Sequence, residues 1–111
     1  MRRPVDPDDC DGRAQILATL GERVALARRR RRYRQQDLAE RAGCSRYMVQ
    51  AIERGSASYS VGHLLAVLWV LGLSETVNLV ANPLFDEVGL TLDVMNGARR
   101  LRLRTKVDND F

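Results

Sequence analysis

Hydrophobic residues in the first part of the chain recur every three or four positions, the spacing of a helix that buries one side. One such stripe begins after Gly12 and runs into the arginines of residues 28–32. Its members are Leu17, Leu20, Val24 and Ala27. The helix dipole favours cations at this end by about 0.3–1 kcal/mol for each well-placed charge. The pattern predicts an amphipathic first helix that starts at Gly12 and ends in the arginine run.

The next segment, QQDLAERAGCSRYMVQAIERG over residues 35–55, has the pattern of a short helix, a tight turn and a second short helix. Leu38 and Ala39 stand at helical positions that face a core. Gly43 follows, where a sharp turn needs a residue that tolerates positive φ. Ser45 then occupies the N-cap position, where its hydroxyl can accept a bond from a backbone N–H of the second helix.

The second short helix divides into an apolar and a polar side. Val49 and Ile52 are three residues apart and point inward. The other side carries Arg46, Tyr47, Gln50 and Arg54. Two guanidinium groups, an amide and a phenol are the groups that bind base edges and phosphates. This face predicts a helix that enters the major groove of DNA.

Residues 56–82 complete the helical part of the pattern. Ser60 is a plausible N-cap for a fourth helix that ends at Gly72, with Trp69 off its apolar stripe. The positions expected to face inward are Val61, Leu64, Leu65, Leu68 and Leu71. Ser74 is expected to cap a short fifth helix, Glu75 to about Ala81, that Pro83 stops.

The last third of the chain has the pattern of two β-strands around a tight turn. Apolar and polar residues alternate in GLTLDVM and in ARRLRLRTKV, and Asn96-Gly97 between them favours a type I′ turn, which needs positive φ twice. In that register Leu92 faces Leu101, Leu90 faces Leu103, Asp93 meets Arg100 and Thr91 meets Arg102. A lone hairpin is marginal in water, so its leucine face must cover the chain's own helices, a second copy or another protein. One strand per chain, paired across a dimer axis, is the simpler alternative.

Size and charge narrow the class of protein. A chain of 111 residues and 12.5 kDa suffices for one domain with appendages. The formal net charge is +4, and Lys106 is the one basic residue among 18 that is not arginine. This balance favours a polyanionic partner.

Other classes of function find little support. We expect no membrane span and no signal peptide, hence a cytoplasmic protein. Cys10 and Cys44 fit reduced thiols rather than a disulfide. Together with His63, the one histidine, they lack the spacing of metal ligands. Without a nucleophile–base pair or a glycine-rich phosphate loop, the sequence predicts neither an enzyme nor a bound cofactor.

Four segments, taken in order, resemble the XRE (Cro/CI-type) helix-turn-helix proteins, which bind DNA. They are LGERVALARRRRR, RQQDLAERAG, SRYMVQAIERG and SVGHLLAVLWVLGL, and they span roughly residues 20–73. Two positions depart from the family. Arg34 stands where Ser or Thr usually caps the second helix, and Arg32 stands where glycine is frequent. These departures bear on the cap of that helix and on the loop before it.

The resemblance implies roles for individual residues. Arg46, Tyr47 and Gln50 would contact bases. The phosphate contacts would be Gln35, Gln36, Ser45, Arg54, Arg31, Arg32 and Arg34. The positions Leu38, Ala39, Gly43, Val49 and Ile52 would form the structural core of the motif. Glu53 matches an acidic position that pairs with an arginine of the first helix. Six arginines in residues 28–34 exceed the two or three that the helix dipole explains, so their role is either structural or phosphate binding.

Proteins of this class generally dimerise and read inverted repeats, so we expect a homodimer on double-stranded DNA. Its interface would use the fifth helix, the C-terminal strands and residues Trp69, Leu90, Leu92, Leu101 and Leu103. Around residues 73–92, the pattern LGLSETVNLVANPLFDEVGLTL resembles HipB-type antitoxins, which repress their own operon and bind a HipA-like serine/threonine kinase toxin. A regulator without a protein ligand and a protein-interaction module with an incidental basic face are the alternatives.

The expected architecture is mostly α-helical. It comprises a five-helix Cro/CI-like helix-turn-helix domain over residues 12–82 and a C-terminal β-hairpin or dimerisation strand over residues 83–107. Residues 1–11 and 108–111 are expected to be flexible tails. Function would then depend on the second short helix for DNA and on the C-terminal segment for a partner.

Overall fold

The computed structural model of the protein describes residues 12–108, with side chains for residues 12–104. The tails expected over residues 1–11 and 108–111 lie outside this part of the chain except for Asp108, which is the last residue of a helix and not part of a tail. Every regular element of residues 12–108 is helical. The chain divides into two compact units between Glu75 and Thr76.

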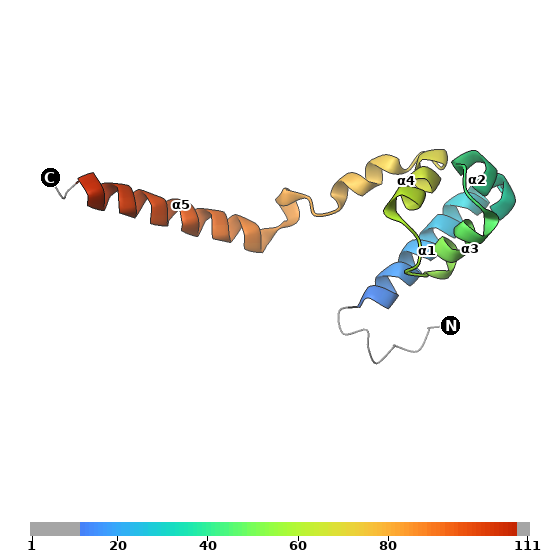
Figure 1. Ribbon diagram of the computed structural model, residues 1–111, viewed down its shortest axis with the longest axis horizontal. Helices are drawn as coiled ribbons and strands as arrows, with labels where there is room; N and C mark the ends of the chain where they lie inside the picture. The colour runs from blue at the N-terminus through green and yellow to red at the C-terminus, as the bar shows by residue number, and fades with distance from the viewer. Residues whose placement is uncertain (1–11, 109–111) are drawn as a thin grey trace. The chain divides into compact units, whose positions relative to one another are not determined.

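The first unit is a cluster of four helices, labelled in Figure 1. They are α1 (Arg13–Arg30), α2 (Gln35–Ala42), α3 (Arg46–Arg54) and α4 (Val61–Val70). Helix α3 packs against α1 and α2, and α2 also packs against α4. All of these helices contribute to one core, whose largest fully buried side chains are Leu38, Ile52, Leu71, Val24, Val49 and Val67. The core holds α3 in place from behind.

Helices α1 to α4 end in the same way, with the paired backbone bonds of a Schellman motif. At the end of α1, Tyr33 N–H donates to Arg28 C=O at 3.2 Å and Arg32 N–H donates to Arg29 C=O at 2.9 Å. The left-handed residue of the other three motifs is Gly43, Gly55 or Gly72. In α1 it is Arg32, with φ 57°. Arg32 therefore takes the conformation that glycine usually adopts at this turn, at a steric cost of about 1–2 kcal/mol.

Gly21 allows α1 and α3 to approach closely. A Cβ atom at this position would lie 2.5 Å from the carbonyl oxygens of Ile52 and Glu53. Gly21 is buried in the middle of α1, where glycine costs helix stability by about 1 kcal/mol relative to alanine. No role was predicted for this residue, although an isolated glycine in a helical pattern is a signal of close packing.

The inward face of α4 differs from the predicted one. Val61 and Leu65 are exposed, whereas Val67 is fully buried beside Leu68 and Leu71. Nearly every residue of VGHLLAVLWV is apolar, so periodicity does not select a face. Val61, Leu65 and Trp69 are four residues apart and form an exposed apolar stripe, in which Trp69 is 72% exposed.

Beyond α4, the chain forms two short 3₁₀ helices and one long α-helix. They are η1 (Ser74–Leu79), η2 (Pro83–Phe85) and α5 (Glu87–Asp108). The short helix expected from Glu75 to about Ala81 is present as the 3₁₀ helix η1, which ends at Leu79 and gives way to a turn. Ala81 in that turn has φ 54°, which an α-helix does not accommodate.

The predicted C-terminal β-hairpin is wrong, because residues 87–108 form α5 and no strand occurs in residues 12–108. Asn96 and Gly97 lie inside the helix, and neither has the positive φ that a type I′ turn requires. Asp86 starts the helix, since its Oδ1 accepts the N–H of Gly89 at 2.9 Å. The expected strand pairs Leu92–Leu101, Leu90–Leu103, Asp93–Arg100 and Thr91–Arg102 therefore do not form within the chain.

Candidate nucleic-acid interface

Helix α3 is fixed at both ends and along its inner side. Ser45 Oγ accepts the backbone N–H of Met48 at 3.1 Å, which confirms the N-cap expected from the sequence. Val49, Ala51 and Ile52 are buried against the core. A helix held in this way presents its opposite side in a defined orientation.

The exposed side of α3 carries the residues expected to contact bases. Arg46, Tyr47, Gln50 and Arg54 are all exposed, Tyr47 by 65%. Their spacing of one, three and four residues places them on one side of the helix. The Arg54 guanidinium carbon lies 5.9 Å from the centroid of the Tyr47 ring, within the range of a cation–π contact. This face offers donors, an acceptor and an aromatic surface to a ligand.

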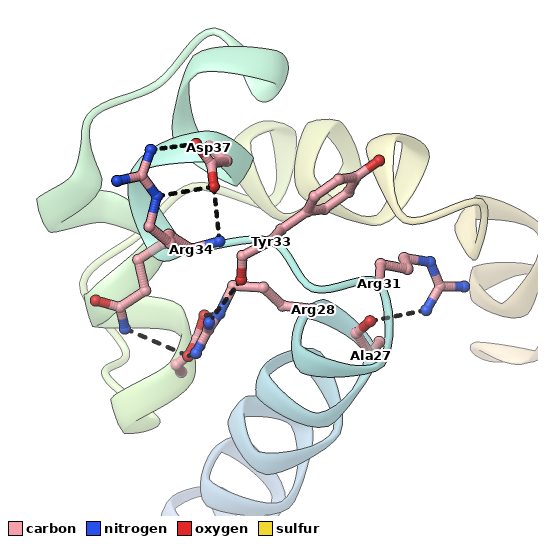
Figure 2. A network of polar contacts seen from close by, with 8 residues as sticks. Ala27, Arg28, Arg31, Tyr33, Arg34 and Asp37 are labelled. Atoms are coloured by element: carbon pink, nitrogen blue, oxygen red, sulfur yellow. Dashed lines mark hydrogen bonds and ion pairs between the residues drawn. The ribbon is translucent and has the colours of Figure 1, made fainter.

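An ion pair between Arg28 and Glu53 ties α1 to α3. Arg28 Nε donates to Glu53 Oε2 at 2.8 Å and Arg28 Nη2 donates to Oε1 at 3.0 Å. The same guanidinium donates from Nη1 to the Tyr33 carbonyl at 2.9 Å, as Figure 2 shows. The two side chains are only 14% and 8% exposed, and paired Arg–carboxylate bonds in such surroundings are strong and directional. The prediction that Glu53 pairs with an arginine of the first helix is confirmed.

Two glutamines at the start of α2 have partners within the chain. Gln35 is half-buried, and its Nε2 donates to Glu53 Oε1 at 3.3 Å. Gln36 is exposed, and its Nε2 donates to Glu40 Oε1 at 3.1 Å. Gln35 thus joins the Arg28–Glu53 pair and places the start of α2 beside α3. The amide nitrogen has a second N–H, so binding a phosphate through this group does not require loss of the bond to Glu53.

Asp37 supplies the cap that Arg34 cannot provide. A guanidinium has no acceptor, so the usual N-cap bond from a side-chain oxygen at position 34 is impossible. Asp37 Oδ2 instead accepts the Arg34 backbone N–H at 2.8 Å, and its carboxylate binds Arg34 Nε and Nη2 at 3.2 and 3.1 Å (Figure 2). The side-chain bond lowers the pKa of Asp37 and raises the pKa of Arg34. The spacing of three residues between cap and acid was the available sequence signal.

Arg29 and Arg30 are exposed in the last turn of α1, and the next two arginines of the run follow the helix. Arg31 and Arg32 are exposed, and Arg31 Nη1 donates to the Ala27 carbonyl at 2.8 Å (Figure 2). The Arg41 guanidinium lies over the Tyr33 ring, 4.6 Å from its centroid, a contact that the sequence analysis did not foresee. Arg31, Arg32 and Arg34 are exposed residues at the connection between α1 and α2, and Figure 2 shows the Arg31 and Arg34 side chains pointing away from each other.

The two cysteines and the candidate metal ligands do not add a second site in the described part of the chain. Burial raises the pKa of the Cys44 thiol, and Cys10 lies outside the described residues. Residues 12–108 hold no group of three His, Cys, Asp or Glu side chains placed to bind a metal. None of the helices described has the length and apolar character needed to cross a bilayer.

Comparison with known proteins identifies the first unit. Residues 19–79 match the helix-turn-helix domain family, and the match is of the XRE-like type. It extends from α1 through η1 and covers more than half of the 111 residues. No curated protein matches the chain at a significant level. The family match and the order of α1 to α4 agree, and the chain belongs to the helix-turn-helix domain family, whose members are DNA-binding regulators.

Proposed function

We propose that the protein is a sequence-specific transcriptional repressor that binds double-stranded DNA as a homodimer, with α3 in the major groove. The exposed face of α3 is the observation that carries this proposal. Arg46, Tyr47 and Gln50 share that face, while the buried side of the helix is held by the core and by Glu53. The protein acts by binding rather than by catalysis.

Base reading follows from the hydrogen-bonding groups on α3. Arg46 presents two donors that fit the O6 and N7 atoms of guanine, and the amide of Gln50 fits adenine. Each such paired contact contributes about 1–3 kcal/mol of discrimination against the wrong base. Tyr47 packs on a thymine methyl group or binds a phosphate.

Phosphate contacts hold the helix in register without reading sequence. Arg31, Arg32 and Arg34 are exposed at the connection between α1 and α2, and Arg54 lies at the end of α3. Further contacts to the DNA backbone come from the start of α2, with Gln35 and Gln36, and from the N-cap of α3, Ser45. The Arg28–Glu53 pair remains intact, since it orients α3 relative to α1. Affinity then falls steeply with salt, in proportion to the number of phosphates contacted.

A single helix of this size touches only a few base pairs. A two-fold dimer places two α3 helices about one helical turn apart and reads an inverted repeat. Selection of bound duplexes from a random DNA library by the purified protein tests the proposal. We expect one inverted-repeat motif to be enriched, whereas recovery of unbiased sequences would contradict sequence-specific binding.

The antitoxin function is a finer proposal that rests on the resemblance around residues 73–92. It is favoured by the exposed apolar side chains of this segment, which offer a surface to a protein partner. They are Leu79, Val80, Leu84, Phe85 and Val88. In this form the protein represses its own operon and neutralises a HipA-like serine/threonine kinase in the cytoplasm.

Affinity capture with the tagged protein from nuclease-treated lysate of the native host distinguishes an antitoxin from a regulator without a protein ligand. A stoichiometric kinase-like partner supports the antitoxin. A variant with Phe85→Asp and Val88→Asp should lose that partner and keep DNA binding. Self-association alone, without a partner, supports a regulator that needs no protein ligand.

A further inference from the structure

Helix α5 carries two apolar stripes on opposite sides. One consists of Leu90, Val94 and Leu101 with Gly97 between them, and the other of Val88, Leu92, Met95 and Leu103. All these apolar side chains are exposed. The second stripe is interrupted by Arg99. None of the four positions of the first stripe, 90, 94, 97 and 101, carries a charge. A helix that has two internal glycines and buries so little is marginal in water, so the uninterrupted stripe requires a cover.

The charges of α5 indicate what covers the stripe. Glu87 and Asp93 lie in its first half. Its second half carries Arg99, Arg100, Arg102 and Arg104. A second copy of α5 in antiparallel orientation brings the acidic half of each helix against the basic half of the other. A parallel pair would place the two groups of arginines side by side, which is unfavourable.

The spacing of the uninterrupted stripe fixes the register. Its positions 90, 94, 97 and 101 follow the four-three-four spacing of a two-helix seam. In an antiparallel pair, Leu90 meets Leu101 of the second copy and Val94 meets Gly97 of the second copy. Leucine then packs on leucine in the outer layers, and Val94 packs on Gly97, which has no side chain, in the central layers. Each layer occurs twice, as two-fold symmetry requires.

The flanking charges fit the same register. Asp93 lies beside Arg100 of the second copy, and Glu87 lies beside Arg104. Within one helix, Asp93 and Arg100 are seven residues apart, too far to pair with each other. The residues three and four positions from Asp93 are uncharged, so neighbours on the same helix do not compete for its carboxylate.

We propose that residues 87–104 of α5 pair with the same residues of a second copy as an antiparallel two-helix interface centred between Met95 and Asn96. This inference rests on the homodimer of the proposed function and specifies its contact surface. It is tested on the full chain without DNA, so its failure is distinct from a failure of DNA binding.

Leu90 and Leu92 form a matched pair for the first test. They are 48% and 51% exposed, two residues apart and on opposite sides of α5. Sedimentation equilibrium of Leu90→Asp should show a dimer dissociation constant raised at least about tenfold. The hairpin prediction placed Leu92 in the dimer interface beside Leu90, whereas the helix places it on the opposite side. Leu92→Asp should therefore stay within about twofold of the wild type. Equal effects of the two substitutions, or a wild-type chain that is monomeric at micromolar concentrations, would overturn the proposal.

Charge exchange tests the orientation and does not depend on the leucine variants remaining folded. Asp93→Arg and Arg100→Asp should each weaken self-association several-fold. The double variant Asp93→Arg/Arg100→Asp should restore it, because both pairs reform with reversed sign. An equimolar mixture of the two single variants should form heterodimers as stable as the wild-type dimer. A double variant as weak as either single variant would exclude the antiparallel register.

Discussion

Helices α3 and α5 use their apolar residues in opposite ways. Helix α3 places Val49, Ala51 and Ile52 on one side and buries all three, so the opposite, polar side is the one exposed to a ligand. Helix α5 places its apolar residues on two sides and leaves them exposed. The difference shows that an apolar stripe identifies a core-facing side only when it is unique. Two exposed stripes do not identify a core-facing side, and the partner that we propose for one of them is a second copy of α5.

The largest expected difference between the two helices concerns their apolar contacts. Ile52→Ala should lower the free energy of unfolding by about 2–5 kcal/mol, because it leaves a cavity in a closely packed core. Leu92→Ala in α5 should change it by about 0.5 kcal/mol or less, since this side chain is half exposed. Urea denaturation followed by circular dichroism measures both. Similar losses in the two variants would mean that α5 packs as tightly as α3.

The two mid-helix glycines sharpen the same comparison with effects of opposite sign. Gly21→Ala should destabilise the fold by about 1–3 kcal/mol, because the added methyl group meets the backbone of α3. Gly97→Ala meets nothing within 4 Å and should stabilise the helix by up to about 1 kcal/mol. Thermal unfolding, with Gly97→Ala measured at concentrations where the chain is monomeric, provides the test. A stabilising Gly21→Ala would refute the close approach of α1 and α3.

Arg32 and Ala81 are the two residues other than glycine with positive φ in the described part of the chain, one in each unit. Arg32→Gly and Ala81→Gly should each relieve steric strain and raise stability by about 1 kcal/mol. Arg32→Gly should also weaken DNA binding and reduce its salt dependence, because a phosphate contact is lost. Ala81→Gly is the control that should leave DNA binding unchanged. If Arg32→Gly lowers stability instead, the Arg32 side chain stabilises the fold by more than the strain of its positive φ destabilises it.

The smallest expected effect concerns the cap that positions α2 beside α3. The pKa of Asp37 lies below its ordinary value of 3.8, so its carboxylate stabilises the fold above that pH and loses this contribution as the pH falls through the lowered pKa. Asp37→Asn should therefore be less stable than the wild type at neutral pH. The difference should vanish in acid below the lowered pKa. Unfolding midpoints of both proteins measured across this pH range test the cap. A stability difference that persists in acid would arise from packing and not from the charge of Asp37.

The helix-turn-helix part was readable from the sequence because its signals agree with one another. The caps at Ser45 and Ser60, the glycine at position 43 and the single apolar side of α3 all favour the same elements. Gly21 was not predicted to matter because its role depends on Ile52 and Glu53, which are more than thirty positions away in the chain. The Arg34–Asp37 cap was missed because the side chain at position 34 has no acceptor.

The C-terminal segment was misread because its signals conflict. Alternating leucines and Asn96-Gly97 favour a hairpin, while Asp86 provides the start of a helix. The alternation also explains the two stripes, since residues two apart lie on nearly opposite sides of a helix. For α4, a helix apolar on nearly every side left its buried face undetermined, and Val61 and Leu65 proved to be exposed.

The central claim is that α3 reads DNA sequence, and selection from a random duplex library with single-residue variants tests it most directly. Wild-type protein, Arg46→Ala and Gln50→Ala would be compared under the same conditions, with circular dichroism to verify folding. We predict that each variant loses the base preference at one position of each half-site and keeps the rest of the motif, because each side chain reads its own base. If both variants select the same motif as the wild type with unchanged preference, α3 does not read the sequence.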